Sequence, residues 1–227
     1  RERERERERE GYGWSGVWHL HRHEVVHRDL APRNLLVDEH ERALVADLGV
    51  AVKLSGDEPS YFTSTDPIPV RVTAPEVLLH AQTTTAADVY MLGMCLYELF
   101  SEREPFPWSA EVLRMPHGPE REAREAYELW QIQQQVKAGH RPPPLEPPQC
   151  PRDIMALIQC CWQQRAQDRP TIEQVRQELF RIHSQLVAMV RARKALMASA
   201  QPHFVSRAPL AWRGSLCALH SSLRPLS

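Results

Sequence analysis

Residues 86–100 are apolar on almost every side of a helix and contain no basic residue. A helix that is apolar all round is typical of an element buried in the interior of a protein. We therefore expect a central buried helix in this segment. Thr85, followed three residues later by Asp88, fits a capping pattern and predicts where that helix begins.

Two further helices are predicted after prolines. Pro151 can open the first, which is apolar on one face at the spacing i, i+3, i+4, i+7 and i+8. These apolar positions are Ile154, Leu157, Ile158, Cys161 and Trp162. The second follows Pro170 with Thr171 as its N-cap. Its apolar positions are Ile172, Val175, Leu179, Ile182, Leu186 and Met189. A terminal helix packed on its own domain and a coiled-coil seam for a partner protein both fit this pattern.

Three further segments have a composition of their own. Residues 34–37 and 43–46 are short apolar runs joined by five polar residues, which predicts a two-stranded hairpin. Residues 141–148, Arg-Pro-Pro-Pro-Leu-Glu-Pro-Pro, predict a stiff connector, although a docking ligand for an aromatic groove has the same composition. Residues 111–129 are rich in Glu and Arg and predict a solvated helix extension or, alternatively, a partner surface.

Three regions are predicted along the chain. Residues 1–15 begin with five Arg-Glu repeats, which cannot enter a hydrophobic core, and we interpret this region as a low-complexity leader. Residues 16–188 have the apolar periodicity of a folded domain. Residues 189–227 are expected to hold the end of the last helix and a tail without periodicity.

Composition and charge narrow the possible partners. The chain is 42% hydrophobic and 25% charged with a formal net charge of −1, so its overall charge favours neither nucleic acid nor an anionic membrane as a partner. No apolar stretch approaches the roughly 20 residues of a membrane helix, and we expect no membrane segment in this chain. The five cysteines form no metal-type spacing and predict reduced thiols in a cytoplasmic protein. Membrane tethering through upstream sequence stays open.

Residues 27–34, His-Arg-Asp-Leu-Ala-Pro-Arg-Asn, carry the strongest chemical signal. The string matches the catalytic-loop signature of protein kinases at each defined position. Phosphoryl transfer needs a carboxylate that accepts the proton of the attacking hydroxyl, and an amide oxygen that holds a metal ion on the phosphates. Asp29 and, five residues later, Asn34 supply these two groups.

A second carboxylate follows the predicted hairpin, in residues 47–49, Asp-Leu-Gly. This tripeptide is similar to the metal-binding Asp-Phe-Gly of kinases, with leucine in place of phenylalanine. Carboxylate and amide oxygens suit magnesium, a hard cation that also contacts nucleotide phosphates. Residues 74–76, Ala-Pro-Glu, then match the motif that closes the activation segment of kinases.

The three motifs, in this order, resemble the protein kinase family and, within it, the tyrosine-kinase branch. Arg33, four residues after Asp29, with Ala31 rather than lysine between them, is similar to the tyrosine-kinase catalytic loop. Residues 68–71, Ile-Pro-Val-Arg, resemble a later landmark of that branch. The resemblance covers residues 16–186 and implies a mainly α fold: a kinase carboxy-terminal lobe with short β-hairpins at the catalytic loop.

The resemblance also implies the chemistry of the site. ATP and Mg²⁺ would be the cofactors, and a tyrosine of a protein substrate would accept the phosphoryl group. Asp29, Arg33 and Asn34 would have catalytic roles. Asn34 and Asp47 would bind the metal, and Leu36 would lie under the adenine ring.

Structural and regulatory roles follow by the same resemblance for His27, Arg28, Tyr61, Glu76, Asp88 and Arg169. Glu76 and Arg169 would form a buried ion pair, in which the loss of one partner costs more stability than the loss of both. Asp88 would brace the catalytic loop. Tyr61 is either an activating phosphosite or an ordinary exposed aromatic residue.

The amino-terminal β lobe of a kinase has no counterpart in this sequence. Residues 11–16 match Gly-x-Gly-x-x-Gly, but only ten residues separate Gly16 from His27, too few for the strands and helix of that lobe. Gly16 fits instead the helix before the catalytic loop. We expect this chain alone to be an inactive or weakly active tyrosine kinase domain. The alternative is a non-catalytic, pseudokinase-like binding module whose last helix or proline-rich segment contacts another protein.

Overall fold

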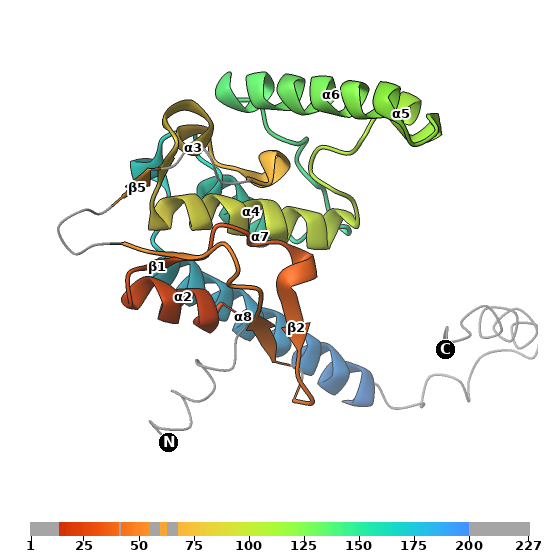
Figure 1. The fold of residues 1–227 in the computed structure, drawn as a ribbon. Helices are drawn as coiled ribbons and strands as arrows, with labels where there is room; N and C mark the ends of the chain where they lie inside the picture. Colours follow the sequence, from red (N-terminus) through yellow and green to blue (C-terminus); the bar gives the residue numbers. More distant parts are fainter. Residues whose placement is uncertain (1–13, 41, 55–59, 63–67, 200–227) are drawn as a thin grey trace, which may run out of the picture. The chain divides into compact units, whose positions relative to one another are not determined.

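The structure is a computed structural model that describes residues 14–40, 42–54, 60–62 and 68–199 (Figure 1). The chain is divided into two compact units, residues 1–182 and residues 183–227. The first unit holds most elements and the candidate site.

The elements in chain order are α2 Ser15–Arg22, β1 Val25–Val26, the 3-10 turn η1 Pro32–Asn34, β2 Leu35–Val37, β3 Ala43–Val45, β4 Val52–Lys53, β5 Tyr61–Phe62, the 3-10 turn η2 Val70–Val72, α3 Pro75–His80, β6 Gln82–Thr83, α4 Thr85–Ser101, α5 Ala110–Arg114, α6 Pro119–Lys137, α7 Arg152–Cys161, the 3-10 turn η3 Ala166–Asp168 and α8 Ile172–Ser199.

Helix α4 forms the centre of the first unit, as the apolar pattern predicts (Figure 1). Helix α7 packs against it so closely that a Cβ atom on Gly93 would lie 2.8 Å from the Cβ of Cys161. Only glycine permits this approach without a shift of one helix. The predicted cap of α4 is wrong: the N-cap is Thr84, which makes no side-chain cap hydrogen bond. The carboxylate of Asp88 does not cap the helix and instead accepts the His27 and Arg28 N–H groups.

The two helices predicted after prolines are confirmed. All five apolar positions predicted for α7 are buried. Thr171 caps α8 reciprocally with Gln174: the Gln174 N–H donates to Thr171 Oγ1 at 3.3 Å, and the Thr171 N–H donates to Gln174 Oε1 at 2.8 Å. In the second unit, the α8 residues Leu186 and Met189 are exposed, so the coiled-coil seam stays a prediction.

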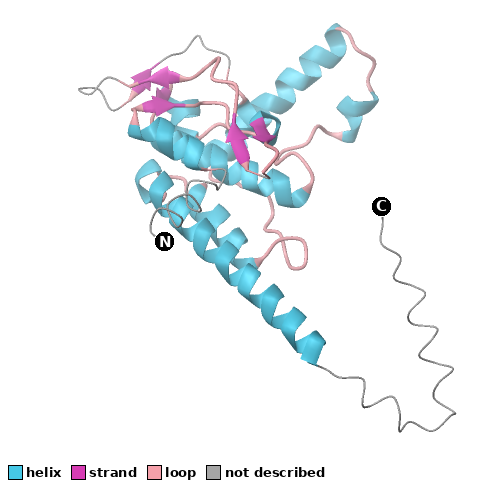
Figure 2. Cartoon of the chain, turned by 90° about the horizontal axis from the view of Figure 1, so that it is seen from below, coloured by secondary structure: helices cyan, strands magenta, loops and turns pink. Residues whose placement is uncertain are grey.

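The described strands form three short antiparallel sheets, each of two strands (Figure 2). Strands β2 and β3 pair as the predicted hairpin, with Leu35 opposite Val45 and Val37 opposite Ala43. Strand β1, just before the catalytic loop, pairs with β4. Strand β5 pairs with β6. The fold is therefore mainly α, and of the three described two-stranded sheets only β2–β3 is a hairpin. These pairings hold the ends of the loops that carry the site.

The segment predicted as a solvated helix extension forms α5 and the first part of α6. Glu128 is buried, and its carboxylate accepts the Ser109 N–H at 3.1 Å. Ser109 in turn caps α5. Leu113 and Tyr127 are 61% and 47% exposed, so the segment carries more apolar surface than its charged sequence predicts.

The expectations about membrane segments, cysteines and the two ends of the chain are tested only where the structure describes the residues concerned. No described helix has the length and apolar character to cross a membrane. Cys95, Cys150, Cys160 and Cys161 are free, and burial raises the pKa of Cys95 to about 12. Most of the predicted leader, residues 1–13, and of the tail, residues 200–227, lies outside the described residues.

Candidate active site

Asp88 of α4 holds the backbone at the start of the catalytic loop. Its carboxylate is fully buried and accepts the His27 N–H at 2.8 Å and the Arg28 N–H at 2.9 Å. The bond to Arg28 matters because that residue has a φ of 71°, in the left-handed region that costs energy for a side chain other than glycine. A buried carboxylate on a rigid helix therefore stabilises a strained loop conformation.

The imidazole of His27 links the catalytic loop to the end of the hairpin. Nε2 lies 3.0 Å from the Ala46 carbonyl oxygen, and Nδ1 accepts the Asp29 N–H at 3.2 Å. The two partners select the neutral tautomer with its proton on Nε2. Because Ala46 precedes Asp47, this one side chain fixes the backbone beside both candidate carboxylates.

His21 belongs to the same network, although no motif or apolar pattern in the sequence marks it. Its Nε2 lies 2.8 Å from Asp88 Oδ2, and its side chain is 7% exposed. Helix α2 places it there. A histidine six residues before His27 has no distinguishing sequence signal, because the partner lies 67 positions away along the chain.

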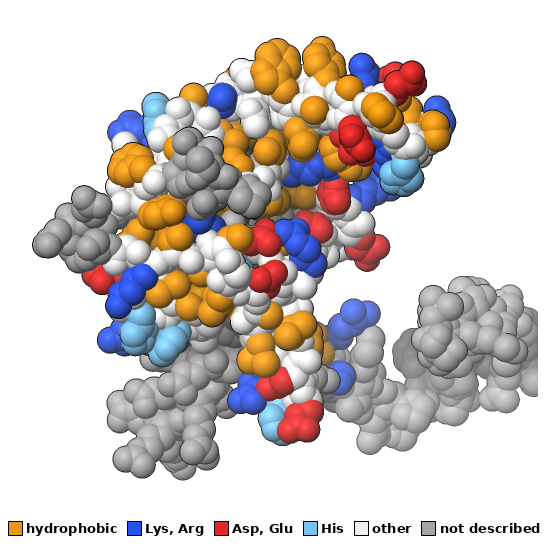
Figure 3. Space-filling model, viewed as in Figure 1, with side chains coloured by type: hydrophobic (Ala, Val, Ile, Leu, Met, Phe, Trp, Pro, Cys, Tyr) orange, Lys and Arg blue, Asp and Glu red, His pale blue; other side chains and the backbone are white. Residues whose placement is uncertain are grey.

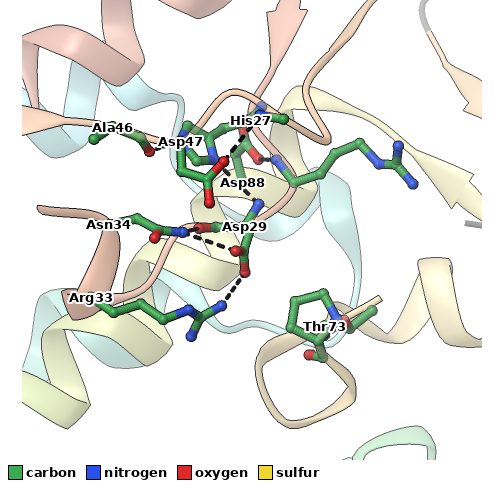
Figure 4. A network of polar contacts seen from close by, with 11 residues as sticks. His27, Asp29, Arg33, Asn34, Ala46, Asp47, Thr73 and Asp88 are labelled. Atoms are coloured by element: carbon green, nitrogen blue, oxygen red, sulfur yellow. Dashed lines mark hydrogen bonds and ion pairs between the residues drawn. The ribbon is translucent and has the colours of Figure 1, made fainter. Parts of the chain in front are cut away.

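The carboxylate of Asp29 is oriented by the two residues predicted to act with it (Figure 4). Arg33 donates from its guanidinium to Oδ1. The Asn34 amide donates to Oδ2 at 2.9 Å and to the Asp29 carbonyl oxygen at 2.7 Å. The Asp29 side chain keeps 18% exposure. A fixed, accessible carboxylate is suited to accept a proton from a hydroxyl of a bound substrate.

Asp47 completes the group of oxygen ligands predicted from the sequence. Its φ is 64°, and its Oδ1 accepts the Gly49 N–H at 3.2 Å, a local turn that directs the side chain. Figure 4 shows its carboxylate turned toward Asn34 and Asp29. Since the Asn34 amide nitrogen donates to Asp29, its oxygen is left as an acceptor, and it accepts no hydrogen bond from the described residues.

These ligands fit a magnesium ion. One carboxylate, on exposed Asp47, and one amide oxygen, on Asn34, offer hard oxygen donors, and Mg²⁺ completes its shell with water and nucleotide phosphates. No group of three or more His, Cys, Asp and Glu side chains suited to a metal occurs among the described residues. A site of this kind therefore depends on the nucleotide for further ligands. In it, the ion would neutralise phosphate charge.

Arg28 connects the catalytic loop with the activation segment. Its guanidinium donates to the Val50 carbonyl oxygen at 3.1 Å and lies 5.3 Å from the centre of the Tyr61 ring. Tyr61 belongs to β5, so it is placed by the pairing with β6. Its hydroxyl-bearing side chain is partly buried, and its ring contacts a cation.

Glu76 and Arg169, distant in sequence, form a bidentate ion pair with both N–O distances at 2.7 Å. The Arg169 side chain is fully buried and also donates to the carbonyl oxygens of Gln163 and Ala86 at 2.9 and 2.8 Å. All parts of the guanidinium thus have partners, which a buried charge requires. The pair ties α3, at the end of the activation segment, to the loop before α8.

Leu36, expected under an adenine ring, lies on β2 with 55% exposure. Leu44 of β3 and Leu48 beside Asp47 are 48% and 53% exposed. Three large apolar side chains on and beside the hairpin are therefore open to solvent. Figure 3 shows hydrophobic side chains on this hairpin.

The fold and these motifs define the protein family to which the chain belongs. The chain belongs to the protein tyrosine and serine/threonine kinase family, whose sequence model matches residues 14–179. It is 34% identical over 172 residues to the tyrosine-protein kinase csk-1 of Caenorhabditis elegans, a match that covers 75% of this chain and 28% of that protein. It is 37% identical over 169 residues to the rat tyrosine-protein kinase JAK3, covering 73% and 15%. The human ephrin type-A receptor 1 is 32% identical over 165 residues, covering 73% and 15%. The chain thus spans less than a third of each of these relatives.

Proposed function

We propose that the domain transfers a phosphoryl group from ATP to a tyrosine of a protein substrate. The observation that carries this proposal is the orientation of Asp29 by Arg33 and Asn34, with the carboxylate of Asp47 turned toward them. Two of the relatives given above are tyrosine-protein kinases, which supports tyrosine as the acceptor.

Each side chain has a separate task in this proposal. Asp29 orients the tyrosine hydroxyl and accepts its proton as the oxygen attacks the γ-phosphorus of ATP, whose bond to the bridging oxygen breaks to release ADP. Arg33 and Asn34 hold that carboxylate, and Asn34 with Asp47 would hold Mg²⁺. His27 maintains the loop and the residue before Asp47 in one arrangement.

This chain by itself is proposed to act weakly. Its three lysines all follow Asp29 in sequence, so none occupies the position of the lysine that pairs with nucleotide phosphates in kinases. The exposed Leu36, Leu44 and Leu48 support the interpretation of residues 16–188 as a carboxy-terminal lobe, because a second lobe would cover such a surface.

Tyr61 is proposed as a regulatory phosphosite. A phosphate on its hydroxyl would add about two negative charges beside the Arg28 guanidinium, which already contacts the ring. The new charge-assisted hydrogen bond would hold β5 against the catalytic loop. The free described cysteines favour a reducing, intracellular compartment for this activity.

The alternative function is a binding module without catalysis. The same exposed apolar hairpin favours it, since a partner protein rather than a second lobe could cover that surface. The two functions differ in nucleotide binding. Only the first needs the Asn34 amide oxygen and the Asp47 carboxylate as ligands.

Thermal unfolding with and without Mg-ATP tests the proposed function. A ligand at about 100 times its dissociation constant stabilises the folded state by about 2.7 kcal/mol. We expect a magnesium-dependent rise of the melting temperature that Asp47→Asn abolishes. Asp168→Asn, at a carboxylate that is half exposed in η3, is the matched control and should retain the rise. A cooperative melt that Mg-ATP leaves unchanged would contradict the proposal and favour the binding module.

A further inference from the structure

Two exposed histidines lie one helical turn apart at the end of α2. His19 is in the last turn of the helix, and His23 is its C-cap residue. Their spacing of four residues places both side chains on one face of the helix. The centres of the two imidazole rings are 4.4 Å apart, and Figure 3 shows histidine side chains gathered on the surface at this end of α2. The two rings therefore form a pair that a small ion can reach from solvent.

A hydrogen bond fixes the tautomer of the His23 ring. Its Nδ1 lies 2.8 Å from the His19 carbonyl oxygen. A carbonyl oxygen only accepts, so Nδ1 carries the proton and donates it. In the neutral imidazole, Nε2 then keeps its lone pair free. A hydrogen bond of this kind on the second ring nitrogen also orients the histidines that bind metal ions in proteins.

The His19 imidazole has no competing partner among the described residues. It makes no hydrogen bond or ion pair there, and its ring contact is with His23. One of its nitrogens can therefore offer a lone pair as well. Imidazole nitrogens bind Zn²⁺ at about 2.0–2.1 Å. Rings with centres 4.4 Å apart allow one nitrogen of each to reach the same ion.

The end of α2 is also favourable for a cation. The carbonyl groups of the last turn give the C-terminus of a helix a partial negative charge. The adjacent Arg22 is stacked on Trp18, with its guanidinium 5.0 Å from the centre of the indole ring. This stack lies on a row of the helix that is rotated by about 100° from the row of His19 and His23. The charge of Arg22 is thus engaged on a different row from the histidine pair.

We propose that His19 and His23 bind a Zn²⁺ ion, with water molecules completing its coordination shell. Imidazole is a preferred donor for zinc, whereas Mg²⁺ prefers oxygen. The site goes beyond the proposed function and is separate from the candidate magnesium site at Asn34 and Asp47. It has two protein ligands, fewer than the groups of three or more that were sought among the described residues and not found. Two ligands fit a site that binds reversibly, because permanent structural zinc sites have four.

The histidine pair lies on the same turn as His21, which contacts the brace of the catalytic loop. The His21 side chain is 7% exposed, and its Nε2 lies 2.8 Å from Asp88 Oδ2. His19 and His23, two residues to either side, are exposed. An ion that binds both of them closes the turn that carries His21. We therefore expect Zn²⁺ to stabilise the end of α2 and, through His21, its contact with Asp88.

The alternative is that His23 only caps the helix. A histidine near the C-terminus of a helix can donate to one of the last carbonyl oxygens. The ring contact with His19 would then be incidental. In that case the two residues would bind zinc no better than other exposed histidines do, and their substitution would change no specific binding step.

Calorimetric titration of the full chain with ZnCl₂, without nucleotide, separates the two. We expect a binding step that the double variant His19→Gln/His23→Gln lacks and that MgCl₂ does not produce. Steps due to other side chains, such as exposed Cys160, remain in the variant and serve as the background. Each single substitution should weaken the step by about 10-fold or more, because one imidazole alone cannot chelate. His117→Gln, at an exposed histidine outside the pair, is the matched control and should retain full affinity.

Amide hydrogen exchange gives a local measure that needs no substitution. The His23 N–H donates to the Leu20 carbonyl oxygen and the Glu24 N–H to that of His21, so both amides report on the turn between the ligands. Zn²⁺ at about ten times its dissociation constant should slow their exchange about 10-fold. Amides of α6, which contains no histidine or cysteine, should be unchanged.

A double variant that retains every zinc-binding step would overturn the inference. An equal loss of affinity in His117→Gln and in the single variants of the pair would overturn it too, because it would show binding by exposed histidines in general. Unchanged exchange at His23 and Glu24 in saturating Zn²⁺ would likewise contradict it. None of these measurements uses nucleotide or substrate, so their outcome is independent of the proposed phosphoryl transfer.

Discussion

The catalytic loop and the β2–β3 hairpin that follows it are adjacent in sequence, yet they are stabilised in different ways. The backbone at His27 and Arg28 is fixed by a buried carboxylate on α4. The hairpin instead exposes Leu36 and Leu44. The first unit therefore contains the contacts that orient the candidate base, Asp29. No described residues cover the hairpin surface that we expect to meet the nucleotide ring.

The largest expected effect comes from the buried ion pair that supports the first region. Glu76→Gln leaves the buried guanidinium of Arg169 without a counter-charge and should lower the free energy of unfolding by about 3–5 kcal/mol. Denaturant unfolding measures this change. Glu178→Gln, which removes one charged partner of partly exposed Arg181, is the control and should cost no more than about 1 kcal/mol. Equal losses of unfolding free energy in the two variants would contradict the claim that the buried pair contributes more to stability than the exposed one.

Substitution of the loop brace should have the next largest effect. Asp88→Asn keeps the size of the side chain but can offer only one carbonyl oxygen to the two backbone N–H groups. We expect a loss of about 1–3 kcal/mol in unfolding free energy, because one buried donor loses its acceptor. Amide hydrogen exchange at His27 and Arg28 should become faster. Unchanged protection from hydrogen exchange at both amides would contradict the role of Asp88 in holding the backbone of the catalytic loop.

The hairpin should tolerate changes that the core does not. Leu44→Ser removes a side chain that is half exposed and should alter unfolding free energy by no more than about 0.5 kcal/mol. Leu30→Ala, at a fully buried position beside Asp29, should cost about 2–5 kcal/mol. Chemical denaturation of both variants measures the contrast. A large loss for Leu44→Ser would mean that the hairpin surface is covered within this chain.

The smallest expected effect is the pH dependence contributed by Glu98. Burial raises its pKa, so the folded state holds this proton more tightly than the unfolded state and stability falls as pH rises through the titration of the group. Glu98→Gln should therefore match the unsubstituted chain at low pH, where Glu98 is neutral, and exceed it in melting temperature at higher pH. The difference in melting temperature across a pH series checks this. If the advantage of Glu98→Gln in melting temperature became smaller toward high pH, the pKa of Glu98 would be lowered in the folded state rather than raised, which would contradict the prediction.

Local patterns predicted the elements and the motif residues. The all-round apolar character of α4, the apolar periodicity of α7 and the two short apolar runs of the hairpin depend on neighbours in sequence, so a single chain suffices to find them. The spacing of Asp29 and Asn34 likewise reflects one short loop. The tyrosine-kinase resemblance then placed Glu76 and Arg169 together, a contact that spacing alone does not predict.

Long-range contacts account for what the sequence pattern missed. Thr85 and Asp88 fit a helix cap, but two backbone N–H groups about sixty residues upstream compete for the carboxylate of Asp88 and bind it instead. His21 joins Asp88, and Arg71 stacks on Trp108, across separations that no local period encodes. The burial that raises the pKa of Glu98 is also visible only once its surroundings are assembled.

Transfer of labelled phosphate from Mg-ATP to a tyrosine-containing peptide tests the central claim that Asp29 acts as the base of a phosphoryl-transfer site. The unsubstituted chain and Asp29→Asn should be compared, with Asp168→Asn as the control. We expect a low rate that Asp29→Asn reduces by about 10²-fold or more, and that the control retains. Equal rates for the unsubstituted chain and Asp29→Asn would contradict the claim.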